Sequence, residues 1–547
     1  MEGSEVHVPA ASEVRPAGID RRQFVLRGAA LGAMLTGSSG WLAACGGGTS
    51  LTSGGKAGGS ITVGADTPTG FDPAFAQYYS DLMVDGAVYE GLVTYKPGTY
   101  DVVNQLAETF EPSADGTRFH FTLKRGIEFQ GGYGELTTDD VKFSFERTAG
   151  MTTPKVNSAY VADWAPQLKE VEIAGKYEGT IVLNHVFAPL MHTTLPTLSG
   201  LIISKKAALE RGKQFGSHPI GSGPYMAQSF TPNRSVVLTK FAKWSGASKS
   251  YVQPSYDTIT ITANGDPTFV DAGLQSGDLN VALIEGSQYK RLSADNSLTV
   301  DKFTSLSYDW IGMNVTNPAL TNINVRKAIR LAIDVPAIIE VAYDGVSPRA
   351  TAVLPPTMSI GYWKDAPVYD RDVPAAKALM NSAGVSNLDL SLVVPNSPSY
   401  FKTIAELVQA NLADIGIKVS IDVLDSASYY APSAAALKKM QLFGGDFASF
   451  PDPFWSMEWF TTAQIGPNGY NWMSWSNKQF DELQNRAAAE LDDAKRTELY
   501  IEMQKIWDED ANSVWLAWPA TIWAADKSVA MKVRPDGLPV IQAFKSV

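Results

Sequence analysis

Alternating hydrophobic and polar positions predict a β-hairpin in the first third of the chain. Phe119, Phe121 and Leu123 alternate with polar neighbours at the period of a half-buried strand. Asp115-Gly116, just upstream, is a typical turn pair. The pattern therefore predicts two strands joined by a tight turn, with one face of the second strand directed into a core.

A change of period marks the start of a helix after this hairpin. Thr138 stands three residues before Val141, and Asp139 and Asp140 fall in the expected first helical turn, where caps and carboxylates favour initiation. Other apolar spacings are typical of helices, several of them stopped by glycine. These segments are 85–92, 272–280, 325–333, 373–384, 405–416, 478–487 and 493–500.

Short apolar runs between the predicted helices read as strands. They lie at 60–64, 201–204, 236–238, 259–262 and 417–421. Strands that alternate with helices favour a mixed α/β sheet. The 547-residue chain, 45% hydrophobic and 10% aromatic, is long enough for several large cores.

The N-terminal segment has the features of an export signal rather than of a folded domain. Arg21-Arg22 precedes a weakly apolar run that ends at Leu42-Ala43-Ala44-Cys45, and this order resembles a twin-arginine signal joined to a lipobox. We therefore expect residues 1–44 to be a signal peptide that is cleaved before Cys45.

Cys45 is the only cysteine of the chain, which excludes an internal disulfide and a multi-cysteine metal or redox site. Its setting predicts lipidation, and two or more acyl chains hold a protein stably on a membrane. Residues 45–59, rich in Gly, Ser and Thr, then read as a flexible, lipidated tether. The alternative for Cys45 is an ordinary buried cysteine.

The charge balance limits the possible partners. A formal charge of −12 and a pI near 5.1 argue against nucleic-acid binding, which needs clustered Lys and Arg. We expect no nucleic-acid partner.

Catalytic and metal-binding motifs are missing from the sequence. It contains no GxSxG, HExxH or paired CxxC, and its five histidines lack ligand spacing on a helix. Ser399 and Lys402 match a bare S-x-x-K spacing, which arises often by chance. We expect no enzyme activity, no cofactor and no metal site.

Aromatic residues are concentrated between Asp446 and Trp475. Most of them must be core, but aromatic faces interrupted by Asn and Gly also stack sugar rings or line peptide side-chain pockets. We expect two or three of them to face a ligand.

The hairpin and the helix after it also resemble a known signature as a literal string. The matching residues are Leu106-Ala107-Glu108, Asp115-Gly116, Leu123, Arg125-Gly126, Phe129, Thr138, Asp140-Val141, Ser144 and Arg147. They resemble the signature of the family 5 extracellular solute-binding proteins, the binding subunits of ABC importers for oligopeptides, dipeptides, nickel complexes and some oligosaccharides. Residues 131–136 depart from the pattern with a longer, glycine-rich loop.

Further matches follow in the order of the family. They are Phe71-Asp72-Pro73, Tyr89-Glu90-Gly91-Leu92, 219–225 (PIGSGPY), 314–334 and 446–453. The glycines of 219–225 suit close packing where the chain crosses between lobes. The resemblance covers nearly the whole chain after residue 60.

The resemblance implies an α/β, periplasmic-binding-protein-like fold of class II (cluster C type), with two main lobes, an extra smaller domain and a ligand cleft that closes like a hinge. Lobe I would comprise 60–85, 215–308 and 520–547. The extra domain II would be 86–214, and lobe III would be 309–519.

The implied function is capture of a small solute, a peptide or an oligosaccharide, for an ABC permease and its ATPase subunits. Nickel complexes fit less well, since His and Cys are scarce. We expect an exported monomer, lipid-anchored on the extracytoplasmic face of the cell membrane (the periplasmic side where an outer membrane exists). The alternatives are a secreted hydrolase and a sensory or receptor module that takes no part in transport.

One position departs from the peptide-binding members. The Asp that grips the ligand's α-ammonium in those members corresponds here to Ser449, and a charged hydrogen bond is worth about 1.5–3 kcal/mol. Asp446 could compensate if it faces the cleft, whereas Asp452-Pro453 reads as a structural turn. The candidate ligand-binding residues are Phe71, Tyr160, Asp446, Phe447, Ser449, Phe450, Trp455 and Trp472.

Overall fold

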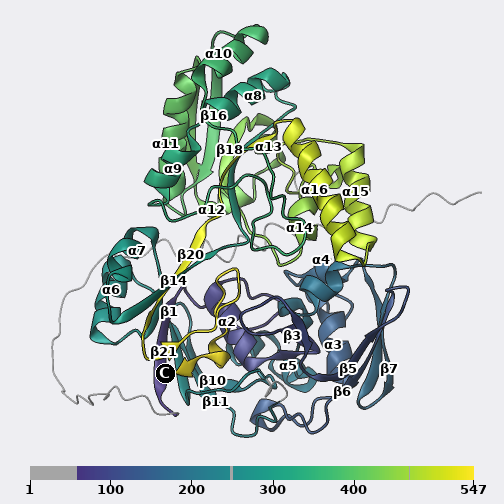
Figure 1. The fold of residues 1–547 in the computed structure, drawn as a ribbon. Helices are drawn as coiled ribbons and strands as arrows, with labels where there is room; N and C mark the ends of the chain where they lie inside the picture. The colour runs from purple at the N-terminus through teal and green to yellow at the C-terminus, as the bar shows by residue number, and fades with distance from the viewer. Residues whose placement is uncertain (1–57, 247–250, 467–468) are drawn as a thin grey trace, which may run out of the picture.

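The computed structural model describes residues 58–547, apart from 247–250 and 467–468 (Figure 1). The predicted signal peptide with Arg21 and Arg22, the predicted lipidation site Cys45 and the tether up to residue 57 lie outside the described residues. None of the helices within the described part is both long and apolar enough to cross a membrane.

The chain forms three main sheets. The largest has seven strands and mixed direction, because β1 runs parallel to both its neighbours whereas the other pairs are antiparallel. In sheet order the strands are β10 (Tyr225–Thr231), β11 (Ser235–Lys240), β12 (Thr258–Ala263), β1 (Ser60–Ala65), β13 (Val281–Ile284), β20 (Ala520–Asp526) and β14 (Leu298–Thr304). We call this part the seven-stranded lobe.

Helices cover both faces of this sheet. Helices α6 (Pro267–Ser276) and α7 (Gly286–Ser293) share one apolar cluster with the sheet, and α2 (Tyr79–Val88) packs into the cluster of the other face. Gly277 ends α6 in a left-handed conformation with φ 80°, as the sequence predicts. The predicted strands at 60–64, 236–238 and 259–262 are confirmed.

The predicted hairpin is part of a four-stranded antiparallel sheet. Its order is β5 (Ala107–Pro112), β6 (Arg118–Leu123), β8 (Glu178–Leu183) and β7 (Leu168–Gly175). Gly116 forms the turn at φ 67°, and the inward residues of β6 are at most 4% exposed. Helix α3 (Thr138–Thr148) begins as predicted, although Thr137 is the cap and forms a capping box with Asp140. We call this part the four-stranded domain.

Shorter elements, which we include in the four-stranded domain, lie between its sheet and the seven-stranded lobe. The helical elements are α4 (Val161–Trp164) and α5 (Lys205–Arg211), with 3₁₀ or π turns at Gln130–Gly132, Leu190–Thr194, Leu198–Gly200 and Gly212–Ser217. The strand pairs are β2 (Glu90–Gly91) with β9 (Leu201–Ile202), and β3 (Val93–Tyr95) with β4 (Val102–Asn104). One apolar cluster runs through the domain and the lobe, so they share a core.

The predicted helix at 85–92 is wrong in its second half. Helix α2 ends at Val88, and Glu90 and Gly91 instead pair with β9. The tertiary contacts favour the strand, because the buried Glu90 carboxylate accepts hydrogen bonds from the Ser222 hydroxyl (3.0 Å) and the Trp244 indole (3.3 Å).

A close approach between backbones supports the predicted role of the glycines in 219–225. A Cβ on Gly221 would lie 2.0 Å from the Val88 carbonyl oxygen, and one on Gly223 would lie 2.5 Å from that of Ala87. Only glycine lets this segment pass so near the end of α2.

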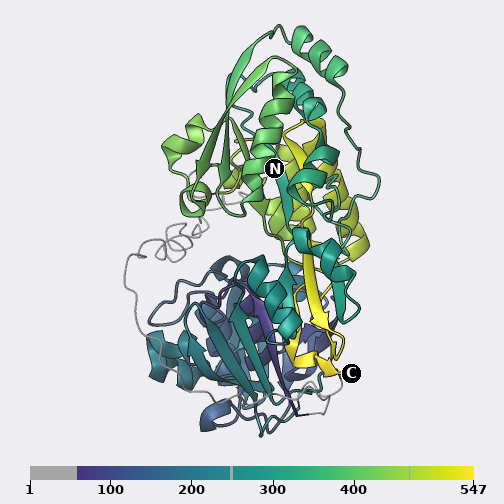
Figure 2. The ribbon, with the colours of Figure 1, turned by 90° about the vertical axis from the view of Figure 1, so that its left-hand side faces the viewer.

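The five-stranded sheet lies apart from the other two (Figure 2). Its strands, in order, are β17 (Ile417–Leu424), β16 (Leu388–Pro395), β18 (Leu442–Phe447), β15 (Tyr308–Met313) and β19 (Ser513–Ala517). One face is aliphatic and packs against α8 (Ile323–Ala332), α9 (Val335–Ala342), α10 (Val373–Ser382) and α11 (Tyr400–Ala413). We call this part the five-stranded lobe.

The opposite face of that sheet is aromatic. Tyr308 and Trp310 of β15 point into it, whereas Ile311 and Met313 belong to the aliphatic side. The elements of this side, and the remaining short ones of the chain, are α12 (Ser426–Tyr430), α13 (Ala434–Lys439), α14 (Pro453–Glu458), Thr462–Gln464, α15 (Lys478–Ala489), α16 (Asp493–Glu509), β21 (Val529–Ala530), Ile541–Ala543 and β22 (Lys545–Ser546).

A buried ion pair fixes the start of α14. Asp452 and Arg496 are both fully buried and form two hydrogen bonds of 2.8 and 2.9 Å. Asp452 also caps α14 by accepting the Phe454 N–H at 2.9 Å. The structural role predicted for Asp452-Pro453 is therefore confirmed, although the pair forms the start of a helix and not a turn.

Two short connections link the five-stranded lobe to the seven-stranded lobe. β14 leads into β15 through Ser305–Ser307, and β19 leads into β20 through Trp518–Pro519. The two connections lie side by side, since the Ser305 N–H donates to the Pro519 carbonyl at 3.0 Å. Paired short connections of this kind suit hinge motion between packed bodies.

Candidate ligand-binding site

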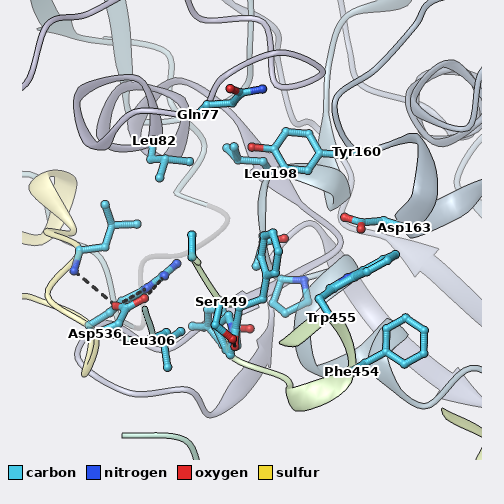
Figure 3. Close-up of a pocket in the computed structure, with 18 of the residues that line it drawn as sticks. Gln77, Leu82, Tyr160, Asp163, Leu198, Leu306, Ser449, Phe454, Trp455 and Asp536 are labelled. Atoms are coloured by element: carbon cyan, nitrogen blue, oxygen red, sulfur yellow. Dashed lines mark hydrogen bonds and ion pairs between the residues drawn. The ribbon is translucent and has the colours of Figure 1, made fainter. Parts of the chain in front are cut away.

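A cavity of about 1390 Å³ lies between the five-stranded lobe and the rest of the molecule. Helix α2 and the segments 94–97, 159–167 and 534–542 contribute one side, residues 446–459 contribute the other, and Leu306 lines it beside the hinge. Figure 3 shows side chains from both sides converging on this space. A large concave site with aromatic walls and a few polar groups is the expected form of a binding site for a small ligand.

The five-stranded lobe supplies an aromatic wall. It consists of Phe447, Phe450, Trp455, Trp459 and Tyr470, all of which line the cavity. Phe447 and Trp459 meet edge to face at 5.4 Å, and Trp459 meets Tyr470 at 5.3 Å. Contacts of this geometry hold the rings in place before a ligand arrives.

Two of the predicted site residues lie behind the walls. Phe71 is fully buried and packs edge to face on Phe230 at 4.7 Å, and Trp472 packs edge to face on Phe447 at 5.5 Å. Neither is among the residues that line the cavity. Each supports a residue that lines the cavity. Phe71 accepts the Tyr89 phenol at its carbonyl (2.8 Å), and Trp472 packs behind Phe447.

The other six predicted residues line the cavity together. Asp446 lies at the end of β18 and Ser449 lies in the loop after it, beside Phe447 and Phe450. The Ser449 hydroxyl is engaged with the Ser456 hydroxyl, and the Asp446 carboxyl accepts the Tyr430 phenol. Burial raises the pKa of Asp446 above its usual range.

Tyr160 lies on the opposite side of the cavity, in the four-stranded domain (Figure 3). Its phenol donates to the Ala76 carbonyl. The ring, rather than the hydroxyl, is therefore the part offered to the cavity.

Two further polar residues of this domain line the same side. Asp163 is 8% exposed, and its carboxylate accepts the Ser199 hydroxyl. Burial raises the pKa of Asp163 to about 7, although the Ser199 hydrogen bond acts in the opposite direction. Gln167 is 5% exposed and lies four residues further on.

Glu458, at the end of α14, is a third carboxyl on the cavity surface. It accepts the Gln484 amide at 3.2 Å. Burial raises the pKa of Glu458 to about 7.

An ion pair from the C-terminal segment occupies another end of the cavity. Arg534 donates its Nε to Asp536 at 3.1 Å and a second N–H to the other carboxylate oxygen. The guanidinium also lies 5.7 Å from the centre of the Tyr95 ring. Asp536 and Asp163 lie on different sides of the space in Figure 3.

The four-stranded domain touches the five-stranded lobe at one edge of the cavity. The Ala188 N–H donates to the Ala488 carbonyl at 2.8 Å, and Phe187 meets Phe454 edge to face at 5.1 Å. A ligand in the cavity is therefore within reach of both bodies at once.

Sequence reasoning did not single out Asp163, Gln167, Glu458 or Arg534. Their neighbours carry no spacing that distinguishes a cavity-facing residue from an ordinary polar residue of a turn or a helix end. The resemblance led to Tyr160, three residues before Asp163, but gave no reason to select the carboxyl.

Metal coordination finds no support in the described part of the chain. Between residues 58 and 547, gaps excepted, no three His, Cys, Asp or Glu side chains come together as a metal site requires.

Comparison with known proteins shows which family this fold and cavity belong to. The model of bacterial extracellular solute-binding proteins, family 5 Middle, matches residues 101–468. The dipeptide-binding protein of Escherichia coli K12 is 28% identical over 480 residues, covering 82% of this chain and 87% of that protein.

Solved structures of other binding proteins have a similar fold. HbpA2 from Haemophilus parasuis has a TM-score of 0.78 at 25% identity, covering 89% of this chain and all of that one. MoaA from A. tumefaciens R10, in complex with mannopinic acid, has a TM-score of 0.72 at 25% identity, covering 90% of this chain and 99% of that one.

The fold and the interlobe cavity therefore define a solute-binding protein of the periplasmic-binding type, a binding protein rather than an enzyme. The family match spans more than half of the chain. This chain belongs to family 5 of the bacterial extracellular solute-binding proteins.

Proposed function

We propose that this protein captures peptides outside the cytoplasm and delivers them to an ABC permease. The observation that carries the proposal is a cavity of about 1390 Å³ whose lining comes from both sides of a two-strand hinge. Only contacts that differ between open and closed states can drive closure. A ligand held by both bodies meets this condition.

The relatives favour peptides over other solutes. The similar protein of E. coli is named for dipeptides, and similar proteins of Pseudomonas aeruginosa and Shigella flexneri are named for di- and tripeptides and for glutathione. The aromatic wall provides area for apolar side chains, which suits ligands of varied sequence.

A sugar derivative is the second candidate. The MoaA structure holds mannopinic acid, and an aromatic wall with nearby carboxyls also suits a polyhydroxyl ligand. The missing carboxylate at Ser449 favours this candidate over peptides that depend on a free N-terminus.

The test is a thermal-shift and calorimetric screen of purified protein. Di-, tri- and tetrapeptides, glutathione and oligosaccharides are titrated in parallel, and native mass spectrometry reports any ligand that purifies with the protein. Peptides should raise the Tm and shift tryptophan emission. Binding of sugars alone would transfer the function to the second candidate, and the absence of binding by any solute would refute transport.

We also propose the domain division given by the resemblance, with Phe71, Tyr160, Asp446, Phe447, Ser449, Phe450, Trp455 and Trp472 as the ligand-binding set. The strands of the seven-stranded sheet fall in 60–85, 215–308 and 520–547, which supports lobe I. Six of the eight residues line the cavity, which supports their inclusion; Phe71 and Trp472 act from behind it.

Export and anchoring complete the proposal. Arg21 and Arg22 direct export, and Cys45 carries the lipid that holds a monomeric protein at the membrane beside its permease. Cys45→Ala should move the protein from the membrane fraction to the soluble fraction, with Ser53→Ala as the matched control. Unchanged partitioning of Cys45→Ala would refute the anchor.

A further inference from the structure

Two buried side chains of the four-stranded domain, Asp163 and Gln167, can accept more hydrogen bonds than their neighbours donate. Among the described residues, the Asp163 carboxylate accepts a hydrogen bond from Ser199 alone. The Gln167 side-chain carbonyl accepts none from that part of the chain, although it is buried. Buried acceptors without donors are rare and need an explanation, such as a bound ligand.

These two residues form one acceptor surface on the cavity. They are four residues apart, in the turn of α4 and its continuation, where the Ala165 N–H bonds to the Val161 carbonyl at 2.8 Å and the Gln167 N–H to the Trp164 carbonyl at 3.0 Å. Side chains at this spacing lie on one side of a helical turn. Both line the cavity, and Figure 3 shows Asp163 directed into it.

An aromatic ring faces this surface from the other body. Trp455 extends from α14 into the cavity on the side where Asp163 lies (Figure 3). Its ring packs on Phe454 at 4.9 Å, and Phe454 meets Phe187 of the four-stranded domain. A carboxylate, an amide carbonyl and an indole face together favour a cation with several N–H donors.

The polar groups near Ser449 are placed differently from Asp163. The Ser449 hydroxyl is neutral and bonded to Ser456. Asp446 accepts the Tyr430 phenol and lies on the same body as Trp455, so a cation held between those two residues would not join the two bodies.

We propose that Asp163, assisted by Gln167, binds a cationic group of the ligand, an ammonium or a guanidinium, against the face of Trp455. The inference rests on the proposed peptide-binding function and selects peptides that carry a basic group. Because Asp163 and Trp455 belong to different bodies, the same contact holds the cleft closed.

The charge of Asp163 links this contact to pH. Burial raises the pKa of Asp163 to about 7, so a bound cation must displace a proton at lower pH. Affinity for a basic peptide should fall up to about tenfold per pH unit below 7. The other titratable side chains of the cavity include Tyr160, His185, Asp446 and Glu458.

The experiment measures peptide Kd by calorimetry at pH 8 and pH 6, with full-length protein. The peptides are Ala-Ala-Ala, acetyl-Ala-Ala-Ala, acetyl-Ala-Lys-Ala and acetyl-Ala-norleucine-Ala. Wild type should prefer either the free N-terminus or the lysine peptide over the counterpart that lacks the cation by about tenfold or more. The preferred pair shows whether the cation is the N-terminus or a side chain.

The variant Asp163→Asn should remove that preference while still binding the peptides that lack a cation. Asp139→Asn, an exposed change in the same domain, should preserve it. A preference that persists in Asp163→Asn, or that disappears in Asp446→Asn instead, would overturn the inference and leave peptide binding intact. Failure of every peptide to bind wild type would overturn the proposed function as well.

A stability measurement separates a binding role from a structural one. The folded state holds the Asp163 proton up to about pH 7, whereas the unfolded chain loses it near pH 4, so this group lowers stability as pH rises between them. Asp163→Asn should therefore raise the Tm of the unliganded protein at pH 8. A lower Tm would indicate a structural carboxyl and count against the inference.

Wild type alone provides a test if the variant does not fold. Basic peptides should release about one proton per site at pH 6, measured as the dependence of binding heat on the buffer's ionisation enthalpy. Equal proton release by the norleucine peptide would contradict the assignment.

Discussion

The two walls of the cavity, one on the five-stranded lobe and one on the four-stranded domain, differ in how many of their polar groups have hydrogen-bond partners within the protein. The aromatic wall rests on packed rings and on a buried ion pair, Asp452 with Arg496, and the two carboxyls that its lobe places on the cavity, Asp446 and Glu458, each accept a hydrogen bond from that lobe. The wall of the four-stranded domain has a carboxyl with one donor and an amide carbonyl with none among the described residues.

This difference separates two tasks within one site. A wall of packed rings provides contact area with little selectivity, because an apolar surface accepts many side chains. Buried acceptors without donors discriminate strongly, since a ligand that lacks N–H groups leaves them unpaired. We therefore expect the aromatic wall to provide contact area and the wall that contains Asp163 to provide selectivity.

The largest effect should come from breaking the base of the aromatic wall. Arg496→Met leaves the buried Asp452 carboxylate unpaired, which costs about 3–5 kcal/mol of unfolding free energy. Urea unfolding should show this loss. Glu482→Gln, at the exposed Lys478 pair, should change stability by less than about 1 kcal/mol; similar losses in both variants would refute a special role for the buried pair.

Removing one ring should weaken binding more than folding. Trp455 is only half-buried and lines the cavity, so Trp455→Ala should reduce peptide affinity about tenfold or more, as truncation of a central aromatic contact does. Calorimetry measures the loss, and Trp455→Phe should recover much of it. Full affinity in the alanine variant would mean that this wall does not contact the ligand.

The Glu458 carboxyl, beside the aromatic wall, should affect stability rather than selectivity. The pKa of Glu458 is raised to about 7 from 4.5, so its ionisation reduces stability as pH rises through that window. Glu458→Gln should stabilise the protein by roughly 1–3 kcal/mol at pH 8 and by less at pH 5. Thermal unfolding at both values checks this. A larger gain at pH 5 would reverse the sign and refute the argument.

The smallest effect is expected at Tyr160. Its phenol is already used by the Ala76 carbonyl, so Tyr160→Phe should cost about 0.5–1.5 kcal/mol of stability and change peptide affinity by less than about twofold. A much larger loss of affinity would show that the hydroxyl contacts the ligand and that the polar wall extends to it.

Local sequence predicted local structure well where one strong rule applied. Gly116 and Gly277 adopt the left-handed conformations that their turn and helix end require. Asp452 caps a helix next to a proline. Prediction failed at Glu90 and Gly91, where pairing with β9 and buried hydrogen bonds outweighed the helical apolar spacing.

The candidate site was predicted in part. The resemblance selected the loop after β18 and Tyr160, and six of the eight candidates line one cavity. Phe71 and Trp472 are aromatic residues of the same kind that lie in the core instead. Composition cannot distinguish the two positions, because a ring in a wall and a ring behind it have the same side chain.

The sequence by itself indicated the family, many of the strands and helices, and the loop around Ser449 as a candidate part of the site. These depend on residue type and short spacing, which a linear string contains. The tertiary structure decided which carboxyls reach the cavity, since Asp163 and Trp455 are distant in the chain and come together only when two bodies pack. Burial, and with it the raised pKa of Asp163, exists only after that packing.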